Sequence, residues 1–279
     1  MNLAKPRFRI VALAFVAGVL ASVAFAHEFW VQPDAFRPAV GAATGVRLFI
    51  GDGLPGEHRP RDARKLERLD IVGPEAGARQ VPIDGKDGAD AVGTITPTKP
   101  GVYAVVYRGK ESTISLAAEE FEEYVRGEGL TDVIKKRAEL NESKAAGGEA
   151  YSRCAKSLLC AGGESHGAWD VKTGLAVEIV PQSNPYAAHA GDTIAFLLLR
   201  DGKPVADAQL MALTRDSGKT IRTIARTDAS GKASFTLQQS GLWVINTVRM
   251  DRVDPKAGRT DVDWVSIWSS LSFDLARAE

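Results

Sequence analysis

Short apolar runs, separated by glycine, proline, aspartate and asparagine, dominate the chain from residue 41 onward. Runs of this length between turn-forming residues are typical of strands in antiparallel sheets. In the first half, the pattern predicts strands at residues 46–50, 69–72, 102–107 and 113–116. In the second half, it predicts strands at residues 175–180, 193–200, 208–214, 220–227, 232–237 and 242–248.

The second half carries the clearer pattern. Its strands are separated by RDGKP, TRDSGK and TDASGK, whose glycines supply the positive φ that tight hairpins need. Six or seven short strands, about 8 to 12 residues apart, indicate an immunoglobulin-like sandwich. We therefore predict a mainly β protein with two immunoglobulin-like β-sandwich domains and a helical insert between them. The predicted N-terminal domain spans residues 27–116, the insert and loop 117–170, and the C-terminal domain 171–279.

A repeated segment relates the two halves. TPTKPGVYAVVYR, which begins at Thr96, aligns without gaps to TLQQSGLWVINTVR, and this places Gly101 on Gly241 and Tyr103 on Trp243. In sandwiches, an aromatic residue that follows such a glycine into a long apolar strand packs at a corner of the core. Both aromatic residues are therefore predicted to be structural, and neither is predicted to bind a ligand.

The insert differs in composition from both halves. Residues 117–143 place apolar residues at helical spacing, interrupted at Gly127 and Gly129, which predicts two short helices. Residues 151–162 are expected to add another turn of helix, and residues 162–170 a loop. Four acidic residues suggest either a metal site or, as we prefer, a solvated helix face: Glu119, Glu120, Glu122 and Glu123.

The first 26 residues resemble a secretory signal peptide. A basic lead precedes an apolar run at residues 10–20, and Ala24-Phe25-Ala26 matches the cleavage pattern. Cleavage after Ala26 would make His27 the first residue of an exported, periplasmic protein. The alternative is a retained membrane anchor, although the apolar run is short for a membrane span.

Charge balance argues against one class of partner. Lysine and arginine number 35, as do aspartate and glutamate, so the formal net charge is zero. Nucleic acid and anionic lipid surfaces attract strongly basic proteins. We therefore predict no nucleic-acid partner.

Cys154 and Cys160 are the two cysteines of the chain. Export to an oxidising compartment favours a disulfide between them across a short loop. The alternative is a soft-metal site, although a C-x5-C spacing is not a standard zinc motif.

Metal-ligand chemistry is the sharpest functional hypothesis. A mature N-terminal His27 can chelate Cu(II) or Ni(II) through its α-amine and its imidazole Nδ1 together. A further imidazole would complete the site, and His166 is the preferred partner because it lies in a glycine-rich loop. His58 and His189 are expected in surface loops. In the alternative interpretation, His27 merely precedes a strand anchored by aromatic residues.

Catalytic motifs are absent from the sequence. It contains no Gly-x-Ser-x-Gly elbow, no His-Glu-x-x-His, no phosphate-binding glycine loop and no dinucleotide fingerprint. A catalytic triad of Ser165, His166 and Asp170 is unfavourable because neighbours in one loop rarely converge. We predict that the protein is not an enzyme.

Several segments together resemble the DUF4198 family. AHEFWVQP, the stretch containing PQSNPY, the DGKP hairpin and the terminal WVSIWSSLSFDL occur in this order along essentially the whole mature chain. The resemblance implies an exported bacterial protein of a kind described as a periplasmic component of cobalt and nickel uptake. The second half also resembles carboxypeptidase-regulatory-like and bacterial immunoglobulin-like modules, which are commonly spacers.

The combined prediction is a periplasmic metal-binding or metal-handling accessory protein for nickel or cobalt transport. Its expected ligand is Ni(II), Co(II) or Cu(II), and its expected partner is a membrane metal permease complex. The alternative is a non-enzymatic sandwich protein, without a metal site, that serves adhesion or the recognition of carbohydrate or protein.

Overall fold

The fold is mainly β, as predicted: 49% of the chain is strand and 11% is helix. The computed structural model describes residues 28–75, 80–254, 256 and 258–276. The expected signal peptide and His27 therefore lie outside the described residues. None of the described helices is both long enough and apolar enough to cross a membrane.

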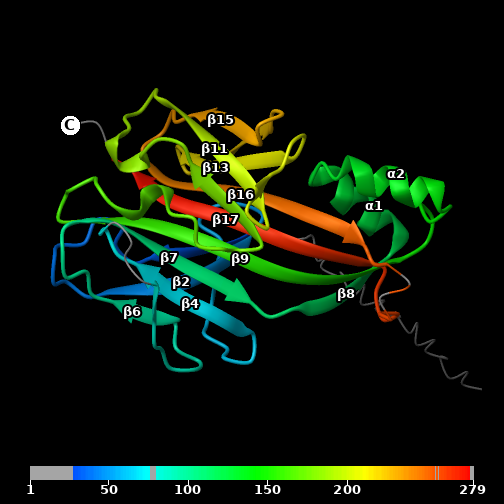
Figure 1. The fold of residues 1–279 in the computed structure, drawn as a ribbon, viewed down its shortest axis with the longest axis horizontal. Coiled ribbons are helices and arrows are strands. Elements are labelled where there is room, and N and C mark those ends of the chain that lie inside the picture. The colour runs from blue at the N-terminus through cyan, green and yellow to red at the C-terminus, as the bar shows by residue number, and fades with distance from the viewer. Residues whose placement is uncertain (1–27, 76–79, 255, 257, 277–279) are drawn as a thin grey trace, which may run out of the picture.

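A nine-stranded sheet forms the centre of the molecule (Figure 1). Its strands come from both halves of the chain: β4 (Leu66–Val72), β5 (Gln80–Pro82), β7 (Gly101–Gly109), β8 (Ser112–Leu116), β9 (Gly147–Ala161), β13 (Gln209–Asp216), β14 (Lys219–Arg226), β16 (Gly241–Arg252) and β17 (Trp264–Leu275). Their order is β14-β13-β16-β17-β9-β7-β4-β5, and β8 pairs with the beginning of β9.

The pairing of β17 with β9 joins the two halves. These strands run parallel, from Trp264 opposite Glu149 to Ser272 opposite Ser157. The other pairings between the named strands of this sheet are antiparallel. One hydrogen-bonded sheet therefore passes through both predicted sandwiches.

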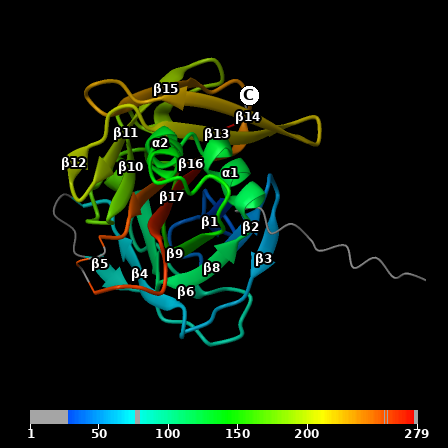
Figure 2. The same ribbon diagram turned by 90° about the vertical axis from the view of Figure 1, so that its right-hand side faces the viewer.

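Two four-stranded sheets cover the central sheet on opposite sides (Figure 2). The N-terminal outer sheet contains β1 (Glu28–Pro33), β2 (Thr44–Gly51), β3 (Glu57–Arg59) and β6 (Gly93–Ile95). The C-terminal outer sheet contains β10 (Val177–Pro181), β11 (Thr193–Arg200), β12 (Lys203–Pro204) and β15 (Lys232–Thr236).

The central strands are buried on both faces. On β7, Val102 and Ala104 pack in the core with the C-terminal outer sheet, whereas Tyr103 and Val105 pack in the core with the N-terminal outer sheet. Because successive strand residues point to opposite faces, a strand between two cores is apolar at nearly every position.

The repeated corner predicted from the sequence is confirmed. Gly101 and Gly241 both have positive φ, at 127° and 97°. The hydroxyl of Tyr103 donates to the carbonyl of Lys99 at 2.9 Å, and the indole Nε1 of Trp243 donates to the carbonyl of Gln239 at 2.8 Å. The two rings lie in different cores, so the repeat builds one corner on each side of the central sheet.

The two predicted helices are α1 (Ala118–Gly127) and α2 (Thr131–Glu139), and they pack over β16 and β17. The rings of Tyr124 and Trp268 stack there with centroids 5.5 Å apart. Of the acidic cluster, Glu119 and Glu123 are exposed, as expected for a solvated face. Glu122 pairs with the buried guanidinium of Arg137 at 2.7 Å.

The expected third helical turn is wrong. Its residues belong to β9, a strand of 15 residues in the middle of the central sheet. Its sequence does not alternate between apolar and polar because both faces of the strand are buried. The following 162–170 stretch is loop up to the short 3-10 helix η1 (Ala168–Asp170), and a second 3-10 helix, η2 (Pro185–Ala187), follows β10.

A buried ion pair connects the central sheet to the C-terminal outer sheet. Lys156 Nζ on β9 lies 2.9 Å from Glu178 Oε1 on β10, and the lysine side chain is 1% exposed. Nζ also donates to the carbonyl of Val171, while Glu178 accepts from the backbone N–H and hydroxyl of Thr173. Burial alone would raise the pKa of Glu178, but Lys156 and these donors hold it below its usual value.

The disulfide expected between the two cysteines is not present in the structure. Cys154 and Cys160 are free, buried thiols on the same face of β9. Six residues of extended strand separate them by about 20 Å. A disulfide needs Cα atoms less than about 7 Å apart, so these two cysteines cannot be joined in this fold.

Replacing Lys156 with methionine should destabilise the protein by about 3–5 kcal/mol, because it leaves the Glu178 carboxylate buried without its cation. The pair should contribute at neutral pH and lose its contribution as pH falls through the lowered pKa of Glu178. Urea unfolding at pH 7, and at a series of pH values from 5 down to 2.5, measures both effects. Lys172→Met, at an exposed position nearby, is the control and should change stability by less than about 0.5 kcal/mol.

Thiol titration of the denatured, unreduced protein should find two free thiols. Burial raises the pKa of both thiols, so in the native protein they should react with iodoacetamide much more slowly than in urea. Finding no free thiol in the monomer would contradict the placement of both cysteines on β9.

Candidate functional site

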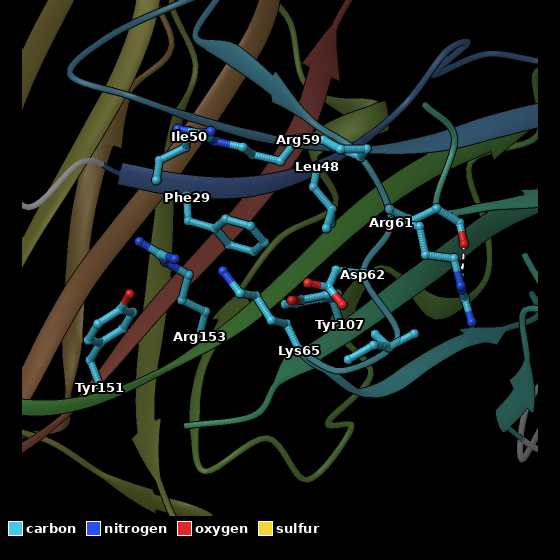
Figure 3. A pocket seen from close by; sticks show the side chains of 13 residues that line it. Phe29, Leu48, Ile50, Arg59, Arg61, Asp62, Lys65, Tyr107, Tyr151 and Arg153 are labelled. Carbon is cyan, nitrogen blue, oxygen red and sulfur yellow. Dashed lines mark hydrogen bonds between the residues drawn. The ribbon is translucent and has the colours of Figure 1, made fainter. Parts of the chain in front are cut away.

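A cavity of about 450 Å³ opens between the N-terminal outer sheet and the central sheet (Figure 3). It lies where β1 and β4 begin and β7 ends. We call it the Arg153 pocket. The residues that line it are Phe29, Leu48, Ile50, Arg59, Pro60, Arg61, Asp62, Lys65, Leu66, Val92, Tyr107, Tyr151 and Arg153.

One part of the wall is apolar and aromatic. The rings of Phe29 on β1 and Tyr107 on β7 lie with centroids 5.1 Å apart, and both belong to the core beneath the N-terminal outer sheet. Leu48 and Val92 belong to the same core. This wall is therefore fixed by strand packing before any ligand binds.

Arg153 on β9 is the most unusual residue of the pocket. Its guanidinium carbon lies 5.2 Å from the ring centroid of Phe29 and 5.0 Å from that of Tyr151. Within the described part of the chain, its Nε is buried without a hydrogen-bond partner, and the side chain forms no ion pair with a carboxylate. Burial is the main reason why its pKa is lowered. A buried guanidinium without an anion is unfavourable.

Cations outnumber carboxylates around the cavity. Arg59, Arg61 and Lys65 join Arg153, against the single carboxylate of Asp62. That carboxylate is engaged by Arg64, whose Nε lies 3.0 Å from Asp62 Oδ1. The pocket therefore carries a positive potential, which favours an anionic ligand.

Tyr107 can act as a hydrogen-bond donor in this pocket. Burial raises its pKa to about 12, and the charge of Arg153 opposes the shift. The hydroxyl therefore keeps its proton at neutral pH. The chemistry on offer is thus a guanidinium and a phenol beside an apolar wall, a combination suited to binding an organic anion.

A group of carboxyl groups lies near the beginning of β1. Glu28 is 5% exposed, and its Oε1 lies 3.4 Å from the guanidinium of Arg222 on β14. Burial, together with the charge of Glu28, raises the pKa of Glu128, at the end of α1, to about 8, and Arg222 opposes the shift. Glu149 accepts a hydrogen bond from the hydroxyl of Tyr124 at 3.1 Å.

The predicted histidines do not come together among the described residues. The carbonyl of His166 accepts from the N–H of Val102, at the beginning of β7, and its side chain is 61% exposed. Phe29, two residues after His27, packs instead against Tyr107 near the other end of β7. The sequence hypothesis of a shared metal site needs His27, which lies outside the described residues.

The two remaining histidines differ in setting. His58 is on β3, not in a loop, with Nε2 2.6 Å from the carbonyl oxygen of Asp90. His189 lies in a loop, as expected, and its side chain is 87% exposed near Asp192. In the described part of the chain, no three His, Cys, Asp or Glu side chains are grouped so that they could hold a metal ion.

Arg153 was not among the site residues predicted from the sequence. It lies in YSRCAKSLLCA, which contains a single arginine and a single lysine within an otherwise mostly apolar stretch. Two cations in a buried strand each need a partner, and this was the available signal. It was hidden because the stretch was interpreted as helix, where both side chains could reach solvent.

Comparison with known proteins gives one family. The sequence model described as "Domain of unknown function (DUF4198)" matches residues 24–251. No curated protein matches the chain significantly.

One similar solved structure is described as a tetra-tandem repeat in the extending region of a large adhesion protein. It shares 12% identity with this chain at a TM-score of 0.23, and the alignment covers 91% of this chain and 50% of that one. The chain thus spans about half the length of that structure, and a TM-score this low does not place the two in one fold. The family match covers well over half of the chain, and the protein therefore belongs to the DUF4198 family.

Proposed function

We propose that this protein is an exported, non-enzymatic binding protein that takes a small organic anion in the Arg153 pocket. The observation that carries the proposal is the Arg153 guanidinium, whose Nε is buried without a partner in the described part of the chain. A ligand carboxylate or phosphate would supply the missing acceptor, and aromatic rings on two sides already hold the guanidinium in place.

The same strand offers an internal comparison. Lys156, three residues after the half-buried Arg153, is fully buried and has Glu178 and a carbonyl oxygen as partners. Lys156 is thus satisfied by the chain itself. Arg153 interacts with the Tyr151 side chain, but within the described part of the chain it has no carboxylate at ion-pair distance and its Nε has no acceptor, and it opens into a cavity, as ligand-binding arginines do.

The wider setting of the proposal comes from the sequence. We propose that cleavage after Ala26 releases the protein into the periplasm, and that the two halves are immunoglobulin-like units merged through β17 and β9. The match to the DUF4198 family describes no function, so the binding role rests on the pocket alone.

Arg153→Gln should abolish stabilisation by small organic anions without destabilising the free protein. Thermal unfolding with benzoate or phthalate should raise the Tm of the wild type, since a ligand at about 100 times its Kd adds about 2.7 kcal/mol. The variant should show no rise, yet it should unfold without ligand at the same or a higher Tm, because it removes a buried, unpartnered charge.

Lys110→Gln is the matched control for this experiment. Lys110 is exposed and does not line the cavity. The control should retain the ligand-induced rise in Tm. An equal rise in wild type and Arg153→Gln would refute the proposed site.

Metal handling at the mature N-terminus is the second candidate function. We propose that His27 chelates Ni(II), Co(II) or Cu(II) for delivery to a membrane permease. A specific observation favours a carboxylate as the further ligand: Glu28, the residue after His27, and Glu128 are close enough for their charges to interact. His166 is a weaker partner because it lies by Val102, near the other end of β7 from Phe29.

Adding one alanine before His27 should weaken metal binding as much as His27→Ala does. The added residue keeps the imidazole but converts the chelating α-amine into an amide, which is a poor ligand. Calorimetry with Ni(II) or Cu(II) on the processed protein measures both, and binding should weaken below about pH 6.5 as the imidazole gains a proton. Equal affinity in the extended and unextended proteins would eliminate this site.

A further inference from the structure

The charge around the Arg153 pocket exceeds what one carboxylate would balance. Besides Arg153, Lys65 lies within ion-pair distance of no carboxylate among the residues that the structure describes; its side chain is exposed, and its charge helps to lower the pKa of Asp62. Arg61 and Arg59 differ from these two. Arg61 donates to the carbonyl of Val92, and Arg59 lies 3.6 Å from the carboxylate of Glu57. Two cations of the pocket, Arg153 and Lys65, are therefore left for a ligand.

These two cations come from separate elements and face one space. Lys65 lies in the turn before β4, where its backbone N–H donates to the carbonyl of Asp62 and its carbonyl accepts from the N–H of Lys110. Figure 3 shows the Lys65 side chain directed toward the space beside Phe29 that Arg153 also borders. The turn is therefore anchored by its backbone, while the amine remains available.

The remaining wall defines the rest of the ligand. Phe29, Leu48 and Tyr107 form the buried floor of the cavity beside the two cations. The half-buried Ile50 and Leu66 add apolar surface that is open to solvent. A small inorganic anion would leave this surface in contact with water, whereas an organic ligand with a ring or short chain would cover it. The charge and the apolar wall of the pocket thus favour a ligand with an anionic group at one end and an apolar body.

We infer that the ligand of the Arg153 pocket is a small organic dianion with an apolar or aromatic body, held at one end by Arg153 and Lys65 together. The inference rests on the proposed anion-binding function and specifies its ligand class. A dicarboxylate and a phosphate monoester share this chemistry. In both, two negative charges would balance the two unpaired cations.

The test compares four probes by calorimetry at pH 8: benzoate, succinate, phthalate and phenyl phosphate. Benzoate has the aromatic body with one charge, succinate has two charges without the body, and the last two have both. Phthalate or phenyl phosphate should bind at least about tenfold more tightly than benzoate and succinate, because both unpaired cations and the apolar wall are used. Whichever of the two binds more tightly identifies the head group.

Lys65→Gln then isolates the second cation. It should reduce the preference for the dianion over benzoate to within about twofold, because only Arg153 then remains to hold the second charge. Lys110→Gln, an exposed lysine next to the same turn and outside the cavity, should keep the full preference. Retention of the tenfold preference in Lys65→Gln would overturn the role of Lys65.

The outcomes separate this inference from the proposed function. If benzoate binds in an Arg153-dependent manner and as tightly as phthalate and phenyl phosphate, the pocket is an anion site but the dianion inference is wrong. If none of the four probes binds in an Arg153-dependent manner, the proposed function and the dianion inference both fail.

Discussion

The burial of β9 on both faces is the constraint on which the rest of this structure depends. β9 lies between β17 and β7 in the central sheet, with an outer sheet over each of its faces. β17 pairs with residues 149–157 of this strand, β7 with residues 154–161 and β8 with residues 147–151. Each polar side chain on this strand must therefore find a partner within one core or the other.

The two cations of β9 meet this constraint in different ways. Lys156 points into the core with the C-terminal outer sheet, where Glu178, Thr173 and Val171 form a closed network. Arg153 points to the opposite face, where aromatic rings flank its guanidinium and Nε has no acceptor among the described residues. The first arrangement stabilises a fold, whereas the second leaves a polar group whose satisfaction requires a molecule from outside.

Local patterns in the sequence predict much of the fold. The two corners at Gly101 and Gly241 can be predicted from the sequence, because a glycine at positive φ followed by an aromatic residue is a local pattern. The two helices can be predicted from the helical spacing of the apolar residues between 117 and 143. β9 was mistaken for helix because a doubly buried strand loses its alternation, and its neighbour β17 lies more than 100 residues away in sequence. That error also concealed the separation of the cysteines and the role of Arg153.

Long-range pairing also determines when the Arg153 pocket can exist. Arg153 lies directly opposite Trp268 in the parallel ladder, and Trp268 belongs to the last strand of the chain. The guanidinium itself is flanked by Phe29 on β1 and by Tyr151 on β9, so its desolvation requires β1 to pack on the central sheet. Ligand affinity at Arg153 is therefore coupled to the assembly of the core beneath the N-terminal outer sheet.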